Sequence, residues 1–239
     1  MELEKIVIGH DRETLDINGL RVESIDGLYR SEDHPMEEAQ EVLASDTKEH
    51  YAHDDIFGLY CNVNEYINCP VDTVYEYAKN IFSLEEWTFS VRDLTHVKDG
   101  VYVGREALAP NTKIFTQLKS NDLTRVVDYF CAWDQNTDLW MRYYCRFIDA
   151  QECLNKPGTV MMWLNCHHPY YDRGTTDVPG HIKASLARTD RPWVGDIWRF
   201  FGAGHRLEAR NLKLILEARN KGSVTKDGNH MPSQIEFSE

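Results

Sequence analysis

Two polar residues, His205 and Glu208, interrupt an apolar stripe near the C-terminal end of the chain. They are three positions apart, so in a helix they lie on the same face. An imidazole that titrates near neutral pH can move protons, and a carboxylate beside it can orient the ring and stabilise its charged form. The pair predicts general acid–base chemistry if the helix covers a cavity. The stripe consists of Val194, Ile197, Trp198, Phe201, Leu212, Ile215 and Leu216.

A second interpretation of this pair stays open. In a helix this long the apolar stripe can drift around the axis. His205 and Glu208 would then lie at its solvent-exposed edge, beside Arg206 and Arg210. Gly202 and Gly204 favour the cavity, because each glycine in a helix interior costs about 1 kcal/mol relative to alanine and indicates a bend or a close approach.

Alternation in the last three predicted strands assigns an inward face to a sheet opposite this helix. We expect His205 to act as acid or base, Glu208 to orient it, and Tyr143 or His168 to donate a proton to a substrate oxygen. Tyr129 shares that face, although a buried tyrosine commonly bonds to the backbone instead. The expected substrate-binding side chains are Tyr129, Trp133, Met141, Met162, Leu164, Trp198 and Phe201. The opposite face is expected to hold Asp128, Arg142, Tyr144, Arg146, Asn165 and His167.

Two clusters have side chains of the types that bind metals. One is His50-x-x-His53-Asp-Asp, and the other would bring His167 or His168 to the helix that carries His205. Neighbouring strand residues point to opposite faces, so only one of that histidine pair could take part. Neither spacing matches a compact metal motif, and no G-x-S-x-G, H-E-x-x-H or phosphate loop is present. We therefore expect no metal and no cofactor.

The composition restricts the possible partners. The chain has 239 residues, 42% of them hydrophobic, which is enough for a substantial core. Its net charge is −13, and residues 1–58 alone hold 16 acidic and 5 basic residues. Such a surface repels phosphate backbones, so we expect no nucleic-acid partner. No apolar run approaches the roughly 20 residues that span a bilayer, and the first ten residues lack the features of a signal peptide. A cytoplasmic protein without membrane insertion is expected.

The six cysteines are scattered and include no C-x-x-C pair, which predicts reduced core residues rather than disulfides or a zinc site. They are Cys61, Cys69, Cys131, Cys145, Cys153 and Cys166.

Residues 1–58 are predicted to form an acidic extension that packs on the main domain. Asn18-Gly19 and Asp26-Gly27 accept positive φ angles and indicate a strand hairpin within residues 5–30. Pro35 suits the first turn of a helix that continues to about His50.

Residues 59–222 are predicted to form the main domain, followed by a flexible tail at 223–239. A strand at 60–68 precedes a helix opened by Pro70 and a helical turn that ends near Trp87. Residues 169–191 lack periodicity and are expected to form a long loop, a candidate lid. Thr189 or Asp190 is expected to cap the last helix, which ends near Arg219. Six more strands are expected at 91–98, 101–108, 113–120, 125–134, 139–153 and 159–168.

The segment Asn64-Glu-Tyr-Ile-Asn-Cys-Pro-Val-Asp-Thr-Val-Tyr-Glu-Tyr-Ala78, with Leu84-Glu-Glu-Trp87 and the last helix, resembles the START and Bet v 1-like (SRPBCC) helix-grip superfamily. The resemblance covers roughly residues 60–219. It implies an α+β fold in which a curved seven-stranded antiparallel sheet surrounds a long C-terminal helix and leaves an internal cavity. The superfamily includes polyketide cyclases and aromatases, lipid-transfer domains and plant ligand carriers, which share a pocket and not a reaction.

The first functional hypothesis is an enzyme of small-molecule biosynthesis that resembles the polyketide cyclase and aromatase branch. It would hold an aromatic or polyketide-like substrate in the cavity and promote cyclisation or dehydration by general acid–base catalysis. The alternative is a non-catalytic carrier of a lipid or another hydrophobic ligand. A metal-dependent enzyme that uses the same cavity is the third and weaker possibility.

Overall fold

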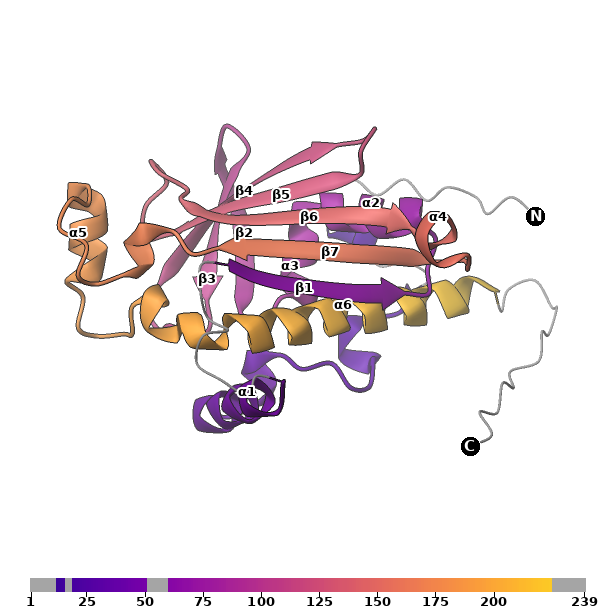
Figure 1. Cartoon of the computed structure of the whole chain (residues 1–239), viewed down its shortest axis with the longest axis horizontal. Coiled ribbons are helices and arrows are strands. Elements are labelled where there is room, and N and C mark those ends of the chain that lie inside the picture. Colours follow the sequence, from indigo (N-terminus) through magenta and orange to yellow (C-terminus); the bar gives the residue numbers. More distant parts are fainter. Residues whose placement is uncertain (1–11, 16–18, 51–59, 225–239) are drawn as a thin grey trace.

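The structure is a computed structural model that describes residues 12–15, 19–50 and 60–224 (Figure 1). Its centre is a curved antiparallel sheet of seven strands in the order β1-β7-β6-β5-β4-β3-β2. All seven predicted strands are present. The sixth is shorter than expected because residues 150–154 turn into a short helix, α4 (Ala150–Leu154). The strands are β1 (Tyr60–Ile67), β2 (Val91–Lys98), β3 (Val101–Glu106), β4 (Lys113–Asn121), β5 (Val126–Trp133), β6 (Met141–Asp149) and β7 (Thr159–Cys166).

Consecutive strands from β2 to β7 pair as a meander, and β1 closes the other edge of the sheet against β7. The β2–β3 turn uses Asp99 and Gly100, whose φ angles of 51° and 72° confirm the predicted hairpin turn. Between β1 and β2 the chain forms α2 (Val71–Lys79), a 3-10 turn η6 (Ile81–Ser83) and α3 (Leu84–Trp87). The predicted apolar face of α2 is buried, and Val74 and Ala78 have no exposed surface.

The long helix α6 (Phe201–Val224) packs along β1, as the sequence predicts. The expected start at Thr189 or Asp190 is wrong, since helical structure begins with the 3-10 helix η8 (Val194–Phe200). Asp190 cannot serve as the cap because its carboxylate accepts hydrogen bonds from Arg188 at 3.0 and 2.6 Å. Asp196 binds the first turn instead, accepting from the Trp193 amide at 2.9 Å.

The segment 169–191 is more ordered than a long loop. It contains a 3-10 turn, η7 (Pro169–Tyr171), and a short helix, α5 (Gly180–Leu186), at one end of the molecule (Figure 1). Arg191 anchors the segment to the end of β5, because its guanidinium bonds to Asp134 and to the Ser185 hydroxyl. This segment does not line the cavity described below.

The N-terminal extension departs from the prediction. The expected helix is present as α1 (Met36–His50), but the described part of residues 12–33 holds 3-10 turns and no strand: η1 (Glu13–Leu15), η3 (Val22–Ser24) and η4 (Ser31–Asp33). The backbone of Tyr29 bonds to α6 instead of to a partner strand. The Asn211 side chain accepts from the Tyr29 amide at 3.0 Å and donates to the Tyr29 carbonyl at 2.9 Å. Gly19 and Gly27 do adopt positive φ angles, 69° and 84°. The division into a 1–58 extension and a 59–222 domain stays a prediction.

The inward face of β7 is the opposite of the one predicted. Trp163 lies directly across from Cys145 in the pairing with β6, and Met161 lies across from Phe147, so these residues share the inward face. Met162 points outward and is 42% exposed, and Leu164 is half-buried on the same outer side. The prediction placed inward the face of β7 with more aliphatic side chains, whereas the sheet buries the indole of Trp163 and the amide of Asn165.

Six free thiols are present, as predicted, but two of them, Cys153 and Cys166, are exposed rather than part of the core. In the described part of the chain, no helix has the length and apolarity needed to cross a membrane.

Candidate functional site

A cavity of about 150 Å³ lies between the sheet and the start of α6. Its walls come from α3 and the segment after it, from the inward faces of β3 to β7, and from η8 and α6. Gln40 and Leu43 of α1 also contribute to its lining, so the N-terminal extension takes part in closing it. The aromatic lining residues include Trp87, Tyr129, Trp133, Tyr143, Trp163 and Phe201.

His205 and Glu208 both line this cavity, and neither sits at a wet edge of α6. They are 8% and 9% exposed. His205 Nδ1 donates a hydrogen bond to Glu208 Oε2 at 2.9 Å, because an ionised carboxylate can only accept. This bond fixes the tautomer, so the neutral ring presents Nε2 as an acceptor. Nε2 is buried and has no hydrogen-bond partner among the described residues.

Aromatic rings hold the His205 imidazole on several sides. Trp163 stacks on it with the ring centroids 4.2 Å apart and the planes inclined by 29°. Phe201 and Tyr143 approach edge-on, with centroid distances of 5.3 and 5.6 Å. The sequence prediction missed Trp163, the ring that stacks on the imidazole. The sequence carried no local signal for it, because the pairing register with β6 that places residue 163 opposite the inward Cys145 is set by the assembled sheet.

Glu208 also has a second hydrogen bond, which connects α6 to the segment after α3. Its Oε1 accepts from the Phe89 amide at 2.7 Å. Both carboxylate oxygens are therefore occupied, which holds the side chain in one orientation next to His205. The buried carboxylate is satisfied by hydrogen bonds from both sides.

Glu106, at the end of β3, is a second carboxyl group in the cavity wall, and sequence reasoning missed it. It is 6% exposed, and it accepts hydrogen bonds from the Leu108 amide at 3.0 Å and from the Ser90 hydroxyl. Burial raises the pKa of this carboxyl group, and the nearby Glu208 raises it further. It has the parity of Tyr102 and Gly104 along β3, but the sequence does not show which face of this strand is buried.

Tyr143 lines the cavity as predicted, and burial raises the pKa of its hydroxyl group well above the ordinary value, so it stays protonated at neutral pH. Tyr129 also lines the cavity, but its hydroxyl donates to the Ala78 carbonyl at 2.8 Å and is used structurally. Of the other predicted wall residues, Trp133, Met141 and Phe201 do line the cavity.

Four predicted site residues lie elsewhere. His168 is absent from the cavity wall, because its Nδ1 accepts a hydrogen bond from the Tyr170 amide at 3.1 Å and thereby caps the η7 turn. Burial lowers the pKa of this imidazole. Trp198 packs against Tyr171 and Phe201 in a second aromatic cluster. Met162 and Leu164 are excluded because their strand presents the other face.

The cavity thiol is unsuited to nucleophilic chemistry. Cys131 Sγ lies 3.2 Å from the Thr116 hydroxyl, and burial raises the pKa of this thiol to about 12. Since the thiolate is the reactive form, Cys131 is a wall residue at neutral pH.

No metal-binding cluster of three or more His, Cys, Asp or Glu side chains occurs in the described part of the chain. His167 does not approach His205. It contacts Asp172, with Nε2 3.6 Å from a carboxylate oxygen, and it packs against Trp198. The predicted cluster around His50 and His53 lies outside the residues whose side chains the structure describes.

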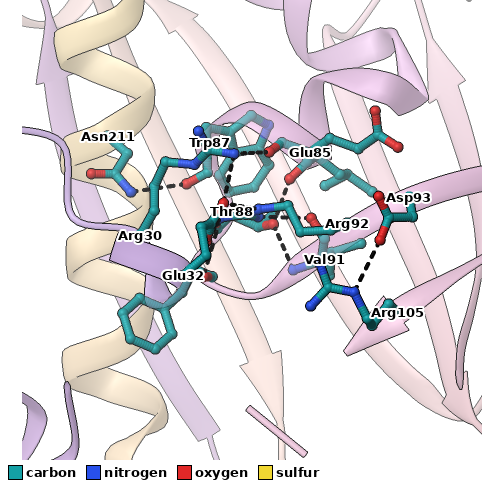
Figure 2. Close-up of polar contacts among 12 residues, drawn as sticks. Arg30, Glu32, Glu85, Trp87, Thr88, Val91, Arg92, Asp93, Arg105 and Asn211 are labelled. Carbon is teal, nitrogen blue, oxygen red and sulfur yellow. Dashed lines mark hydrogen bonds and ion pairs between the residues drawn. The ribbon is translucent and has the colours of Figure 1, made fainter. Parts of the chain in front are cut away.

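A polar network beside the cavity ties the N-terminal extension to the main body (Figure 2). Arg92, which is 5% exposed, donates to both carboxylate oxygens of Glu32 at 2.6 and 2.8 Å. The same guanidinium donates to the Thr88 and Val91 carbonyls at 3.0 and 2.7 Å. Asn211 of α6 reaches the Trp87 carbonyl in the same region. The segment 87–91, which lines the cavity, is thereby held between the extension and α6.

No protein-family model matches the chain, and no curated protein matches it. Similar solved structures include Zhui aromatase/cyclase from Streptomyces sp. R1128, at 13% identity over 71% of this chain and 98% of that chain, with a TM-score of 0.45. The di-domain ARO/CYC BexL from the BE-7585A biosynthetic pathway has 14% identity over 70% of this chain and 47% of its own, with a TM-score of 0.45. A START superfamily protein from Mycobacterium smegmatis has 12% identity over 69% and 98%, with a TM-score of 0.38.

The assignment of a helix-grip fold rests on this chain's own strand order and on α6 packed along β1.

Proposed function

We propose that this protein is an enzyme that binds a small aromatic substrate in the cavity and promotes a proton-transfer step such as cyclisation or dehydration. The observation that carries the proposal is the hydrogen bond of 2.9 Å between His205 Nδ1 and Glu208 Oε2 inside an aromatic-walled cavity. A paired imidazole and carboxylate can carry out general acid–base catalysis, whereas binding an apolar ligand does not require such a pair.

In the proposed mechanism His205 Nε2 accepts a proton from the substrate while Glu208 stabilises the resulting imidazolium. The hydrogen bond to Glu208 keeps the ring in the tautomer that leaves Nε2 free. The Tyr143 hydroxyl, which burial keeps protonated, exchanges its hydrogen bond with Tyr171 for one to a substrate oxygen. The aromatic walls exclude water and fix one substrate orientation, and such positioning can contribute much of the rate.

The cavity volume limits the substrate. A closed apolar cavity of about 150 Å³ holds a molecule of the size of benzene, and the volume here is about 150 Å³. One aromatic ring with short substituents therefore fits without rearrangement.

Gly204 provides a test of whether the cavity binds a ligand. It lines the cavity, and a Cβ added at this position would meet no atom within 4 Å. Native mass spectrometry of the wild-type protein should find a retained small molecule that Gly204→Leu, which fills the space, does not retain.

The identified molecule is then incubated with the wild-type protein and with His205→Asn. Chemical conversion by the wild-type protein, lost in His205→Asn while binding persists, supports an enzyme. Binding without conversion by either protein would instead favour the non-catalytic carrier.

A further inference from the structure

The charged groups of the cavity are unbalanced. Glu106, His205 and Glu208 line it, and none of its described lining residues is lysine or arginine. His205 and Glu208 satisfy each other through their 2.9 Å hydrogen bond. Glu106 has no such partner, because its hydrogen bonds come from two uncharged groups, the Leu108 amide and the Ser90 hydroxyl.

The nearest cationic side chain does not neutralise Glu106. Arg92 lies close enough for a weak electrostatic effect, but its guanidinium is bound to Glu32 and to the Thr88 and Val91 carbonyls. The other titratable groups that face Glu106 are Glu208, which repels its charge, and the Cys131 thiol, which is uncharged at neutral pH. A buried carboxylate without a cation is costly, so an occupied cavity would gain most from a ligand that brings one.

The aromatic walls favour the same kind of ligand. The faces of tryptophan and tyrosine rings attract a cation through their quadrupoles, and the attraction increases when water is excluded. A carboxylate or phosphate ligand would meet two carboxyl groups and no lysine or arginine, and His205, the basic side chain of the described lining, already bonds to Glu208, so an anion is disfavoured.

We propose that the cavity selects a one-ring aromatic ligand that carries a protonated amine, with the ammonium group held at Glu106 and the ring between the aromatic walls. This substrate class rests on the proposed function, since it assumes that the cavity is the ligand site.

Three matched probes test the proposal: 2-phenylethylamine, which is cationic, 2-phenylethanol, which is neutral, and phenylacetate, which is anionic. Their affinities for the full-length protein are measured by isothermal titration calorimetry at neutral pH. The amine should bind about tenfold or more tightly than the alcohol, the ratio expected from one hydrogen bond between charged groups, and phenylacetate should bind more weakly than the alcohol.

The Glu106→Gln variant removes the charge while keeping the shape and an acceptor for the Leu108 amide. It should bind the alcohol as the wild type does and reduce the preference for the amine to about one. Glu152→Gln, on the exposed helix α4, makes the same change of net charge away from the cavity and should keep the preference. Far-ultraviolet circular dichroism checks that each variant is folded, and the wild-type ligand series is a test by itself if Glu106→Gln is not.

Proton linkage gives a second readout. Burial raises the pKa of Glu106 in the empty cavity, and a bound ammonium ion should lower it again, so binding at a pH near the raised pKa should release protons and the heat of binding there should depend on the ionisation enthalpy of the buffer. Glu106→Gln should abolish this dependence.

Binding of phenylacetate as tight as that of the amine would overturn the substrate class, and so would an amine preference that survives in Glu106→Gln. With either result, binding of the alcohol would still support the cavity as the ligand site. If none of the three probes binds, both this inference and the proposed function fall.

Discussion

Glu208 accepts a hydrogen bond from the backbone amide of Phe89, 119 positions earlier in the chain, at a distance of 2.7 Å. The carboxylate that orients His205 therefore also joins α6 to the segment that leads into β2. The orientation of the His205 ring and local stability are coupled in one side chain, and suitable substitutions can separate them.

Glu208→Gln and Glu208→Ala should differ in stability and agree in activity. Glutamine still accepts from the Phe89 amide, whereas alanine leaves that buried donor unsatisfied, at a cost of about 1–3 kcal/mol. Both variants lose the ionised partner of His205 Nδ1, so turnover of the ligand identified by mass spectrometry should fall by about 10²–10⁴. Urea unfolding and single-turnover kinetics measure the two effects. Full activity in Glu208→Gln would contradict the assigned role.

Gly204→Ala should stabilise the protein without blocking the cavity. Alanine is about 1 kcal/mol more favourable than glycine in a helix interior, and the added Cβ meets no atom within 4 Å. Thermal and urea unfolding should therefore show a gain of up to about 1 kcal/mol. The longer Gly204→Leu side chain should fold equally well but lose the bound ligand. A Gly204→Leu protein that binds like the wild type would show that the ligand lies elsewhere.

Arg92→Lys should lower the free energy of unfolding clearly, and Arg105→Lys should change it little. Arg92 is buried, and lysine cannot reproduce its forked bonds to Glu32 and the nearby carbonyls, so we expect a loss on the order of 2 kcal/mol. Arg105 pairs with Asp93 at 2.9 Å, but the two side chains are 55% and 70% exposed, and its substitution should cost less than about 1 kcal/mol. Both pairs are visible in Figure 2. Equal urea midpoints for the two variants would contradict a structural role of Arg92.

Stability should fall as the pH rises because of Glu106. Burial raises the pKa of its carboxyl group in the folded state, so the folded protein binds a proton more tightly than the unfolded chain does. The contribution is complete below the unfolded pKa and is lost as the pH rises toward the folded value, at most about 1.4 kcal/mol per pH unit. Glu106→Gln removes this slope, and its stability advantage should grow with pH in urea titrations from pH 4 to 8. Parallel curves for the two proteins would exclude a raised pKa at Glu106.

The sequence by itself determined the order of the elements. Turn residues such as Asp99-Gly100 and the apolar repeat of α2 are local signals, and they placed the seven strands of the sheet, α1 and α2 to within a few residues, but not the start of the last helix or the short helices α4 and α5. The His205–Glu208 pair was also found from the sequence, because polar residues inside an apolar helical stripe are visible in periodicity alone.

The tertiary structure decided which residues gather around that pair. Trp163 faces inward although its strand has more aliphatic residues on the other side, and this follows from the pairing register with β6, which connects residues far apart in the chain. His168 leaves the site because its strand ends two residues earlier and the chain turns into η7.

Glu106 shows the same limit. A single glutamate in a strand looks like a surface residue, because the sequence does not tell whether a neighbouring chain segment supplies its hydrogen bonds or removes it from water. Only the packing of β3 against residues 88–91 and α6 buries it without a cation. Local backbone preferences and hydrophobic periodicity are written in short stretches of sequence, whereas burial and the partners of a charge depend on contacts that the complete fold creates.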